Sequence, residues 1–316
     1  MSEALLMKGN EALAEAVIRA GCKGYFGYPI TPQSEILEYL TAEARQRGMV
    51  VLQVESELAA INMVYGAAGA GVRAMTSSSS PGMSLMQEGL SYIACAELPC
   101  LVVNVNRGGP GLGTIQPSQG DYFQSTKGGG HGDYRLLVLA PASVQEMADF
   151  VFEGFDLAEK YRNPVLILAD GALGQMMEKV VFRQYDPKDH ETAKPWATTG
   201  KTPDRERNII TSLHIQPEKM EDINKHLQEK YQRMQSEARC EIIHGDDAEV
   251  LVVAYGLAAR ICHSAVETAR ARGMKVGLLR PQTLYPYPTP ALVELASKVR
   301  AMHVVELNAG QMVEDV

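Results

Sequence analysis

The sequence predicts an α/β protein of two domains, each built on a mainly parallel sheet. Its 316 residues exceed the usual size of a single domain. Apolar runs of strand length alternate with helix-length segments, which is the pattern of a parallel sheet covered by helices. A stretch rich in charge and proline interrupts this alternation and indicates a boundary. Hydrophobic residues make up 46% of the chain and charged residues 22%, as in ordinary globular proteins.

The first predicted domain covers residues 1–182, where an amphipathic helix is followed by strands and helices in alternation. The expected helices cover residues 10–20, 33–47, 58–71, 83–94 and 144–161, and the expected strands cover 24–27, 50–54, 74–77, 100–105 and 164–169.

The second predicted domain covers residues 248–316 and is smaller. Strands are expected at 250–255, 276–279 and 302–306, and helices at 258–272 and 289–299. The segment 183–247 contains many charges and the only tryptophan, Trp196, and is predicted to be a connector with a polar helix over 217–238. The last expected strand ends close to residue 316, an unusual place for a domain to stop, so we expect the second domain to be truncated.

Composition argues against several classes of partner. The net charge is -8 and no cluster of Lys and Arg is present, so a nucleic-acid partner is not expected. No apolar run approaches the roughly 18 to 20 residues that span a bilayer, and residues 1–10 lack the features of a secretory signal. The cysteines are never spaced as Cys-x-x-Cys, so no metal or cluster site is expected on this chain. We expect a cytoplasmic protein, with any iron-sulfur cluster on another chain.

Polar residues that directly follow strands mark the candidate site, because ligands of open parallel sheets bind beyond the carboxyl ends of the strands. Such residues lie in the segments 28–33, 55–57, 76–82 and 104–121. In the first segment, Pro29 and Pro32 restrain the backbone around Thr31, as a substrate contact requires. Thr31 followed by Pro32 is equally a common start of a helix, with Thr31 as the N-cap.

In the second segment, Glu55 and Glu57 flank Ser56 and lie on one face if the preceding strand continues. One of them could be catalytic, or both could stabilise the dipole of the following helix. The serines at 77–80 precede Pro81 and Gly82 without the Gly-Lys-Ser/Thr of a phosphate loop, so a turn and helix cap is expected there.

The most unusual segment is rich in glycine and follows Arg107. A loop of roughly 40 residues without structure of its own is uncommon in a compact domain and usually functional, and glycines let the backbone approach a ligand. Arg107, at the end of a strand, suits bidentate binding of a carboxylate. A surface ion pair is the alternative role for this side chain.

Together these segments resemble the 2-oxoacid:ferredoxin oxidoreductases, the pyruvate:ferredoxin oxidoreductase-like family, over nearly the whole chain. The matching motifs occur in family order: Tyr28-Pro29-Ile30-Thr31-Pro32, Ser56-Glu57, Thr76-Ser77-Ser78-Ser79, Arg107-Gly108-Gly109 and His303-Val304-Val305-Glu306-Leu307-Asn308. The resemblance implies an alpha subunit, in which a pyrimidine-type thiamin diphosphate-binding domain precedes a domain similar to the C-terminal domain of transketolase.

By this resemblance Thr31 and Arg107 would bind the substrate carboxylate, and Glu57, together with the segment formed by Tyr28, Pro29 and Ile30, would bind the cofactor. Glu57 would also be catalytic, because a carboxyl group on the aminopyrimidine nitrogen of thiamin diphosphate helps to create the carbon nucleophile that attacks a 2-oxoacid. Glu55 would keep its stabilising role.

Thiamin diphosphate enzymes also need a Gly-Asp-Gly motif and a downstream Asn to hold Mg²⁺ and the diphosphate, and this sequence contains no such motif. The resemblance therefore implies a beta subunit that carries this half of a shared site, with small gamma and delta subunits, the latter bearing ferredoxin-like iron-sulfur clusters. The implied reaction is CoA-dependent oxidative decarboxylation of a 2-oxoacid to acyl-CoA and CO₂, with ferredoxin as the electron acceptor.

The segment 111–118 resembles the 2-oxoisovalerate branch of the family, although 2-oxoglutarate enzymes are similar nearby. A 2-oxoglutarate enzyme needs a second cation for the distal carboxylate, and Lys127, Arg73 and Arg135 are candidates. We expect a substrate of the 2-oxoisovalerate type, with 2-oxoglutarate as the alternative. A non-catalytic structural subunit is a further alternative, but the joint presence of Thr31, Glu57 and Arg107 argues against it.

Overall fold

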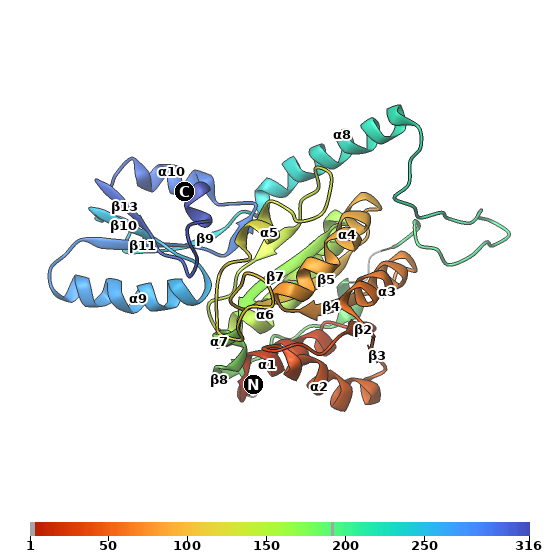
Figure 1. The fold of residues 1–316 in the computed structure, drawn as a ribbon, viewed down its shortest axis with the longest axis horizontal. Coiled ribbons are helices and arrows are strands. Elements are labelled where there is room, and N and C mark those ends of the chain that lie inside the picture. The colour runs from red at the N-terminus through yellow and green to blue at the C-terminus, as the bar shows by residue number, and fades with distance from the viewer. Residues whose placement is uncertain (1–3, 191–192) are drawn as a thin grey trace.

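In the computed structural model, which describes residues 4–190 and 193–316, a large unit holds a seven-stranded sheet and a smaller unit holds a four-stranded sheet (Figure 1). Residues 1–3 of the N-terminal stretch and 191–192 of the predicted connector lie outside the described residues. Both sheets are mainly parallel and are covered by helices, which is the α/β architecture that the alternating pattern predicted.

The large sheet has the strand order β12-β6-β7-β5-β4-β2-β3. All neighbours in it are parallel except β12 and β6, which are antiparallel. Every residue of β5 is buried because helices cover both faces of the sheet. The strands are β2 (Gly24–Gly27), β3 (Val50–Gln53), β4 (Ala74–Ser78), β5 (Cys100–Asn106), β6 (Leu137–Leu139), β7 (Pro164–Asp170) and β12 (Thr283–Tyr285).

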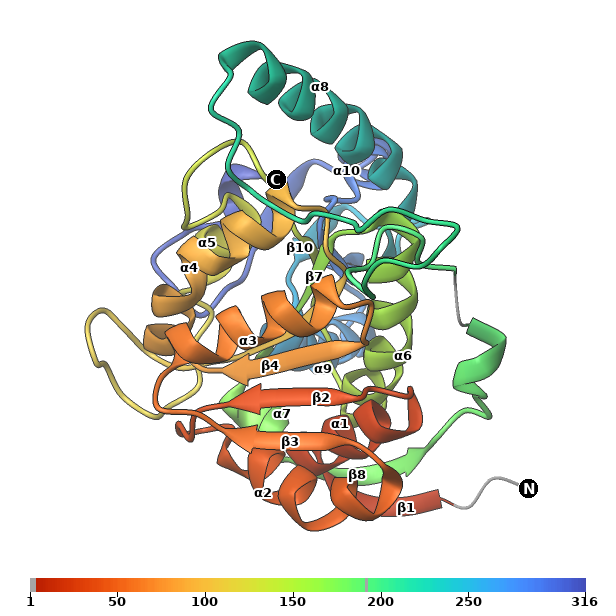
Figure 2. The ribbon, with the colours of Figure 1, turned by 90° about the vertical axis from the view of Figure 1, so that its right-hand side faces the viewer.

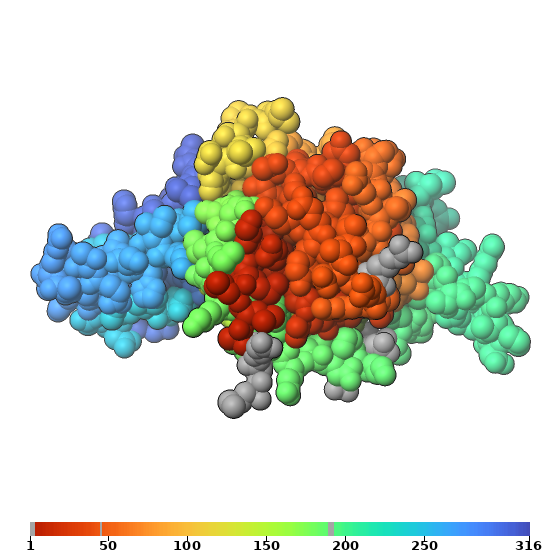
Figure 3. All heavy atoms as spheres, turned by 90° about the horizontal axis from the view of Figure 1, so that it is seen from below, coloured from red at the N-terminus to blue at the C-terminus, as the bar shows by residue number. Residues whose placement is uncertain are grey.

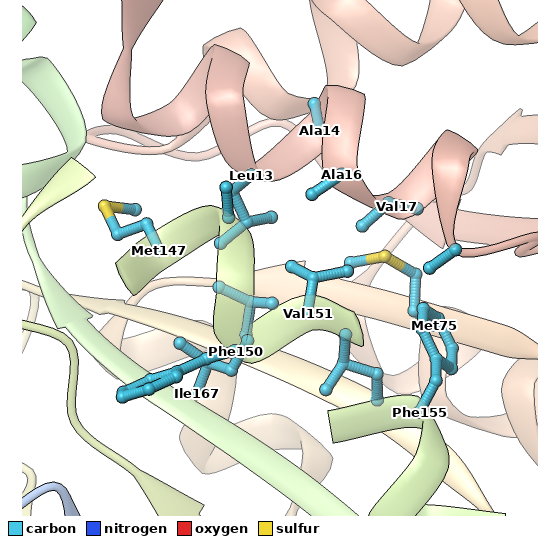
Figure 4. Packing of buried hydrophobic residues seen from close by; sticks show 14 of the residues in the cluster. Leu13, Ala14, Ala16, Val17, Met75, Met147, Phe150, Val151, Phe155 and Ile167 are labelled. Carbon is cyan, nitrogen blue, oxygen red and sulfur yellow. The ribbon is translucent and has the colours of Figure 1, made fainter. Parts of the chain in front are cut away.

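Two helical layers enclose this sheet. One layer contains α1 (Gly9–Arg19), α2 (Ser34–Glu43) and α6 (Val144–Tyr161), and the other contains α3 (Glu57–Gly69) and α4 (Ser80–Cys95) (Figure 2). In the first layer, Leu13 and Val17 of α1 pack with Val151 and Phe155 of α6 over Met75 of β4 (Figure 4). These contacts pack the first helical layer against the central strands of the sheet.

Several short elements were not predicted from the sequence. They include an antiparallel pair formed by β1 (Ala4–Lys8) and β8 (Met177–Val181), and the helix α7 (Gly171–Gln175). The expectation of a long loop without structure after Arg107 was wrong, because this stretch contains α5 (Tyr122–Thr126) and β6. The predicted polar helix is α8 (Pro217–Met234), and single 3-10 turns occur at Ala44–Arg47, Pro187–His190, Gln235–Glu237 and Met312–Glu314.

The smaller unit extends to one side of the large unit (Figure 3). Its strand order is β13-β10-β11-β9, with β9 antiparallel to β11. β9 comes from the segment predicted as a connector, whereas β12 lies within the second predicted domain and joins the large sheet. The elements are β9 (Cys240–Ile243), β10 (Val250–Val253), α9 (Gly256–Ala271), β11 (Val276–Pro281), α10 (Thr289–Ala296) and β13 (Ala301–Val304).

Buried polar contacts join the two units. Arg280 of β11 donates two hydrogen bonds to Glu146 of α6, at 2.8 and 2.7 Å. The Gln119 side chain donates to the carbonyl of Tyr255 at 2.9 Å and accepts from the amide of Leu307 at 3.0 Å. Among the described residues, no helix has both the length and the apolar character needed to cross a membrane.

Candidate active site

The segments predicted to form the site meet at the carboxyl ends of β2, β3, β4 and β5. Thr31 follows β2, Glu57 follows β3, and Arg107 follows β5. β4 pairs with both β2 and β5, so its end at Ser78 lies between these segments. The parallel topology therefore brings together residues that are far apart in the sequence.

Arg107 is buried, with 7% of its surface exposed. Its Nη1 donates to the carbonyl of Thr31 at 2.9 Å, and its Nη2 donates to the carbonyl of Leu112 at 2.8 Å. Nε has no partner among the described residues, and no carboxylate there pairs with this guanidinium. The alternative of a surface ion pair was therefore wrong.

The glycine-rich loop folds back over Arg107 as a tight turn. The amide of Gly108 donates to the carbonyl of Gln116 at 3.0 Å, and the amide of Thr114 donates to the carbonyl of Gly108 at 2.7 Å. Gly113 has a φ of 67°, and a Cβ there would lie 1.8 Å from the Gly108 oxygen. Only glycine fits this position, so the turn that carries Leu112 to Arg107 depends on it.

Thr31 does not cap a helix, because α2 begins at Ser34 and its N-cap is Gln33. The capping alternative was therefore wrong, and the Thr31 residue is exposed beside Arg107. Tyr28 and Pro29 are also exposed, and Ile30 is half-buried. This segment therefore forms an accessible edge of the site.

Glu57 is the first residue of α3, and Ser56 caps that helix by accepting the amide of Ala59 at 3.2 Å. Only 5% of Glu57 is exposed, and its Oε1 accepts a hydrogen bond from Ser78 Oγ at 3.3 Å. Glu55 is exposed, because β3 has already ended at Gln53. The two carboxylates therefore do not share a face, and only Glu57 points into the protein.

A close approach of α4 fixes the Glu57 carboxylate. A Cβ on Gly82 would lie 2.4 Å from Glu57 Oε1 and 2.0 Å from Ser78 Oγ. Ser79 is the N-cap residue of α4 and Ser80 is its first residue, so a helix begins where one was expected, but the Ser79 side chain makes no capping hydrogen bond and strand β4 leads to the helix without a turn. The α4 backbone at Gly82 thus forms one wall around the carboxylate.

Sequence reasoning assigned no binding or catalytic role to several polar residues at this edge. Gln33 is fully buried and accepts from Ser77 Oγ at 2.7 Å, and Ser77 also contacts the Tyr25 hydroxyl at 2.8 Å. Burial raises the pKa of Tyr25 to about 12, so this hydroxyl stays protonated. The sequence placed Gln33 and Ser77 near the carboxyl ends of expected strands but did not reveal their burial. The other residues overlooked as binding groups are Ser80, Asn104, Asn106 and Asp121.

Buried polar atoms without a partner accumulate at this edge. Among the described residues these include Gln33 Nε2, Thr76 Oγ1, Ser79 Oγ, Asn106 Nδ2 and Arg107 Nε. Each unsatisfied buried group costs about 1 to 3 kcal/mol. A bound molecule that supplies hydrogen bonds here would recover part of this free energy, which is a reason to expect one.

These residues fit one half of a thiamin diphosphate site. A buried carboxylate beside an accessible, proline-restrained segment suits an aminopyrimidine ring, which needs an acidic partner for one nitrogen and apolar cover for its faces. Fold and site together define a thiamin diphosphate-binding domain of the pyrimidine type, followed by a smaller α/β domain similar to the C-terminal domain of transketolase.

Comparison with protein families agrees with this class. Residues 15–244 match the model described as pyruvate flavodoxin/ferredoxin oxidoreductase, thiamine diphosphate-binding, and residues 248–316 match pyruvate:ferredoxin oxidoreductase core domain II. The chain therefore belongs to the pyruvate:ferredoxin oxidoreductase-like family of 2-oxoacid oxidoreductases, as the motifs predicted.

Relatives of the chain within this family carry two different names. The chain is 52% identical to the ketoisovalerate oxidoreductase subunit VorB of Methanothermobacter thermautotrophicus, over 98% of this chain and 88% of the relative. It is 37% identical to the 2-oxoglutarate synthase subunit KorA of Methanocaldococcus jannaschii, over 98% and 90%. Both names describe subunits, so the relatives act within multi-subunit enzymes, and the greater similarity is to the ketoisovalerate subunit.

Two solved structures share the fold. A 2-oxoglutarate:ferredoxin oxidoreductase from Magnetococcus marinus, with 2-oxoglutarate, coenzyme A and succinyl-CoA bound, superposes with a TM-score of 0.89 at 28% identity. The match covers 99% of this chain and 60% of that protein's chain. A split-gene transketolase has a TM-score of 0.55 at 13% identity over 97% of this chain and 80% of its own, a likeness of fold alone.

Proposed function

We propose that the chain is the alpha subunit of a CoA-dependent 2-oxoacid:ferredoxin oxidoreductase that acts on a branched 2-oxoacid such as 2-oxoisovalerate. The observation that carries this proposal is the buried Arg107 guanidinium, which has no carboxylate partner among the described residues and lies beside Thr31. A buried cation without a counter-ion is costly. A substrate carboxylate would neutralise it and fix the orientation of the 2-oxo group.

The surrounding cations favour a substrate with one carboxylate. Arg73 lies at the opposite end of β4 and binds Glu159 at 3.0 Å. Lys127 pairs with Asp315, and Arg135 donates to the carbonyl of Tyr134 at 3.0 Å. Arg73 and Lys127 are thus already paired with carboxylates, and the described structure shows no contact between any of the three candidates and Arg107 or Thr31. The similarity to the ketoisovalerate subunit supports the same choice.

In this proposal each residue of the edge has a separate task. Arg107 and Thr31 bind the substrate carboxylate, and the segment formed by Tyr28, Pro29 and Ile30 covers the cofactor ring. Glu57 holds a proton at the aminopyrimidine nitrogen, where its burial keeps water away. When bound, thiamin diphosphate supplies the carbon nucleophile for the 2-oxo carbon.

The remaining parts of the enzyme would come from other chains. A beta subunit would hold Mg²⁺ and the diphosphate, and a delta subunit beside a gamma subunit would carry the iron-sulfur clusters. CoA would accept the acyl group, and two electrons would pass singly to ferredoxin while CO₂ is released. The cysteines, all described and all free of disulfides, suit a reducing compartment such as the cytoplasm.

The test is to purify the complex that contains this chain and to assay bound thiamin diphosphate and reduction of ferredoxin or viologen. A panel of 2-oxoacids is supplied with CoA. We expect reduction with 2-oxoisovalerate. Reduction with 2-oxoglutarate alone would favour the alternative substrate, and a complex that retains the cofactor but oxidises no 2-oxoacid would indicate a structural subunit.

A further inference from the structure

Asp121, which sequence reasoning did not assign, lies in a hydrogen-bond network behind Arg107. Its Oδ2 accepts from Ser80 Oγ at 2.6 Å and from Asn104 Nδ2 at 2.8 Å. Ser80 Oγ lies 3.0 Å from the amide nitrogen of Arg107, 3.1 Å from its carbonyl oxygen and 3.2 Å from Asn106 Oδ1. The Ser80 hydroxyl therefore stands between the half-buried carboxylate and the main chain of Arg107.

A hydroxyl has one proton, so Ser80 can donate to only one of its neighbours at a time. The contact with Asp121 is the shortest, and a hydrogen bond to a carboxylate is roughly twice as strong as one between neutral groups. The proton therefore points at Asp121, and the lone pairs of the hydroxyl are left to accept the amide of Arg107. Asp121 thus orients the Ser80 hydroxyl so that this hydroxyl accepts the hydrogen bond from the Arg107 amide.

We propose that Asp121 is a positioning residue for the substrate site: through Ser80 it fixes the main chain of Arg107 and so aims the guanidinium at the substrate carboxylate. This inference rests on the proposed function, in which Arg107 binds the 2-oxoacid. Asp121 itself touches neither substrate nor cofactor.

Hydrogen bonds from the smaller unit hold the segment around Asp121 in place. The amide of the neighbouring Gln119 donates to the carbonyl of Leu307 at 3.0 Å, and Asn308 Nδ2 donates to the carbonyl of Gln119 at 2.7 Å. Gln311 Nε2 donates to the carbonyl of Gly120 at 2.8 Å. The loop between Arg107 and α5 is therefore anchored to the smaller unit immediately before Asp121. Docking of that unit contributes to the substrate geometry.

Burial raises the pKa of the Asp121 carboxyl above its ordinary value, and the hydrogen bonds from Ser80 and Asn104 only limit this rise. No Lys, Arg or His in the described part of the chain forms an ion pair with it. Its ionised form therefore depends on these two donors, so Asp121 and Ser80 act as a unit.

The test uses the assembled complex and compares Asp121→Ala, Asp121→Asn and Ser80→Ala. Asp121→Ala should raise the KM for the 2-oxoacid on the order of tenfold, the effect of losing hydrogen bonds to a charged group. The kcat and the affinity for thiamin diphosphate should change less than about threefold. Asp121→Asn keeps an acceptor for the Ser80 hydroxyl, so its KM should lie much closer to the wild-type value than that of Asp121→Ala. Asp133→Ala, an exposed acid in the same glycine-rich region, is the matched control.

A double-mutant cycle adds a second readout. If Ser80 transmits the effect, Ser80→Ala should raise the KM as Asp121→Ala does, and the double variant should be no worse than either single variant. An unchanged KM in Asp121→Ala and Ser80→Ala, in a complex where Arg107→Met still raises it, would overturn this inference and leave the proposed function standing. Equal losses in kcat and cofactor affinity would also overturn it, because they indicate general disruption. If Asp121→Ala does not assemble, the KM of Ser80→Ala decides.

Discussion

Arg107 shows how one residue can be held by the fold and still be free for a ligand. Main-chain carbonyls occupy two of its nitrogens, while Nε remains without a partner in the described chain. We predict that Arg107→Met raises the KM for the 2-oxoacid and leaves thiamin diphosphate binding nearly intact. Loss of a charged hydrogen bond costs about 1.5 to 3 kcal/mol, roughly ten- to over a hundredfold in KM. Steady-state kinetics across several 2-oxoacids is the measurement, and unchanged kinetics with all of them would refute a role in substrate binding.

Glu57 provides a second test at the scale of a residue. Glu57→Gln keeps the size of the side chain but cannot deliver a proton to the aminopyrimidine nitrogen. We expect turnover to fall by about 10² to 10⁴, the usual contribution of general acid-base groups, while the complex still assembles. Exchange of the cofactor C2 proton with deuterium should slow to the same degree. Glu55→Gln, with the same charge change at an exposed position, should stay within about threefold of wild type; exchange lost in Glu55→Gln instead would reverse the assignment.

The sequence identified the positions of these residues better than their surroundings. Glu55 and Glu57 were ambiguous because a strand was assumed to continue through them, and the early end of β3 at Gln53 separates an exposed acid from a buried one. Thr31 was ambiguous because Thr-Pro commonly starts a helix, yet α2 starts later. Gln33 and Asp121 were overlooked because their roles depend on contacts with residues distant in the sequence.

At the scale of elements, the turn from β4 into α4 shapes the site. We predict that Gly82→Ala lowers turnover strongly, because its Cβ would lie 2.4 Å from Glu57 Oε1 and must displace that carboxylate. Overpacking of this kind costs about 1 to 3 kcal/mol of stability. Gly66→Ala is the control, because a Cβ on this α3 glycine meets nothing within 4 Å; it should stabilise by about 0.4 to 1 kcal/mol. Melting temperature and turnover of both variants test this, and wild-type turnover in Gly82→Ala would contradict it.

Long periodic elements were predictable from the sequence, and short pairing strands were not. The core strand β5 and the helices α1 and α6 were expected close to their observed bounds, because apolar runs and helical periodicity are local signals. β9 and β12 have three or four residues each, and only their partners make them strands. Since β12 crosses back to the large sheet, its role follows from tertiary pairing that periodicity does not encode.

At the scale of the whole molecule, Arg280 and Glu146 join the two units. Burial alone would raise the pKa of Glu146, but the hydrogen bonds and the charge of Arg280, together with hydrogen bonds from the Ala142 amide and Gln282, outweigh burial and lower it. A lowered pKa in the folded state means stability that is present above the unfolded pKa, about 4.3, and lost as pH falls through the folded value.

We predict that Glu146→Gln destabilises the protein by about 1 to 3 kcal/mol at pH 7, and that the difference in stability from wild type shrinks in acid. Melting temperature against pH measures this. Glu218→Gln, an exposed acid of α8, should follow wild type throughout. A Glu146→Gln difference that does not shrink at all as the pH falls would exclude the ion pair as its cause.

The proposed division of the site between chains gives the last prediction: this chain alone should bind thiamin diphosphate weakly. Its described edge offers Glu57 and apolar cover to the aminopyrimidine, yet residues 4–190 and 193–316 contain no group of three metal-ligating side chains. The diphosphate carries most of the cofactor's charge and is held in such enzymes through Mg²⁺. Calorimetry should therefore detect little binding to the isolated chain and tight, Mg²⁺-dependent binding once a beta subunit is added. Addition of a chelator to the assembled complex should return the affinity to that of the isolated chain. Tight stoichiometric binding by this chain alone would mean that the diphosphate half of the site lies within it.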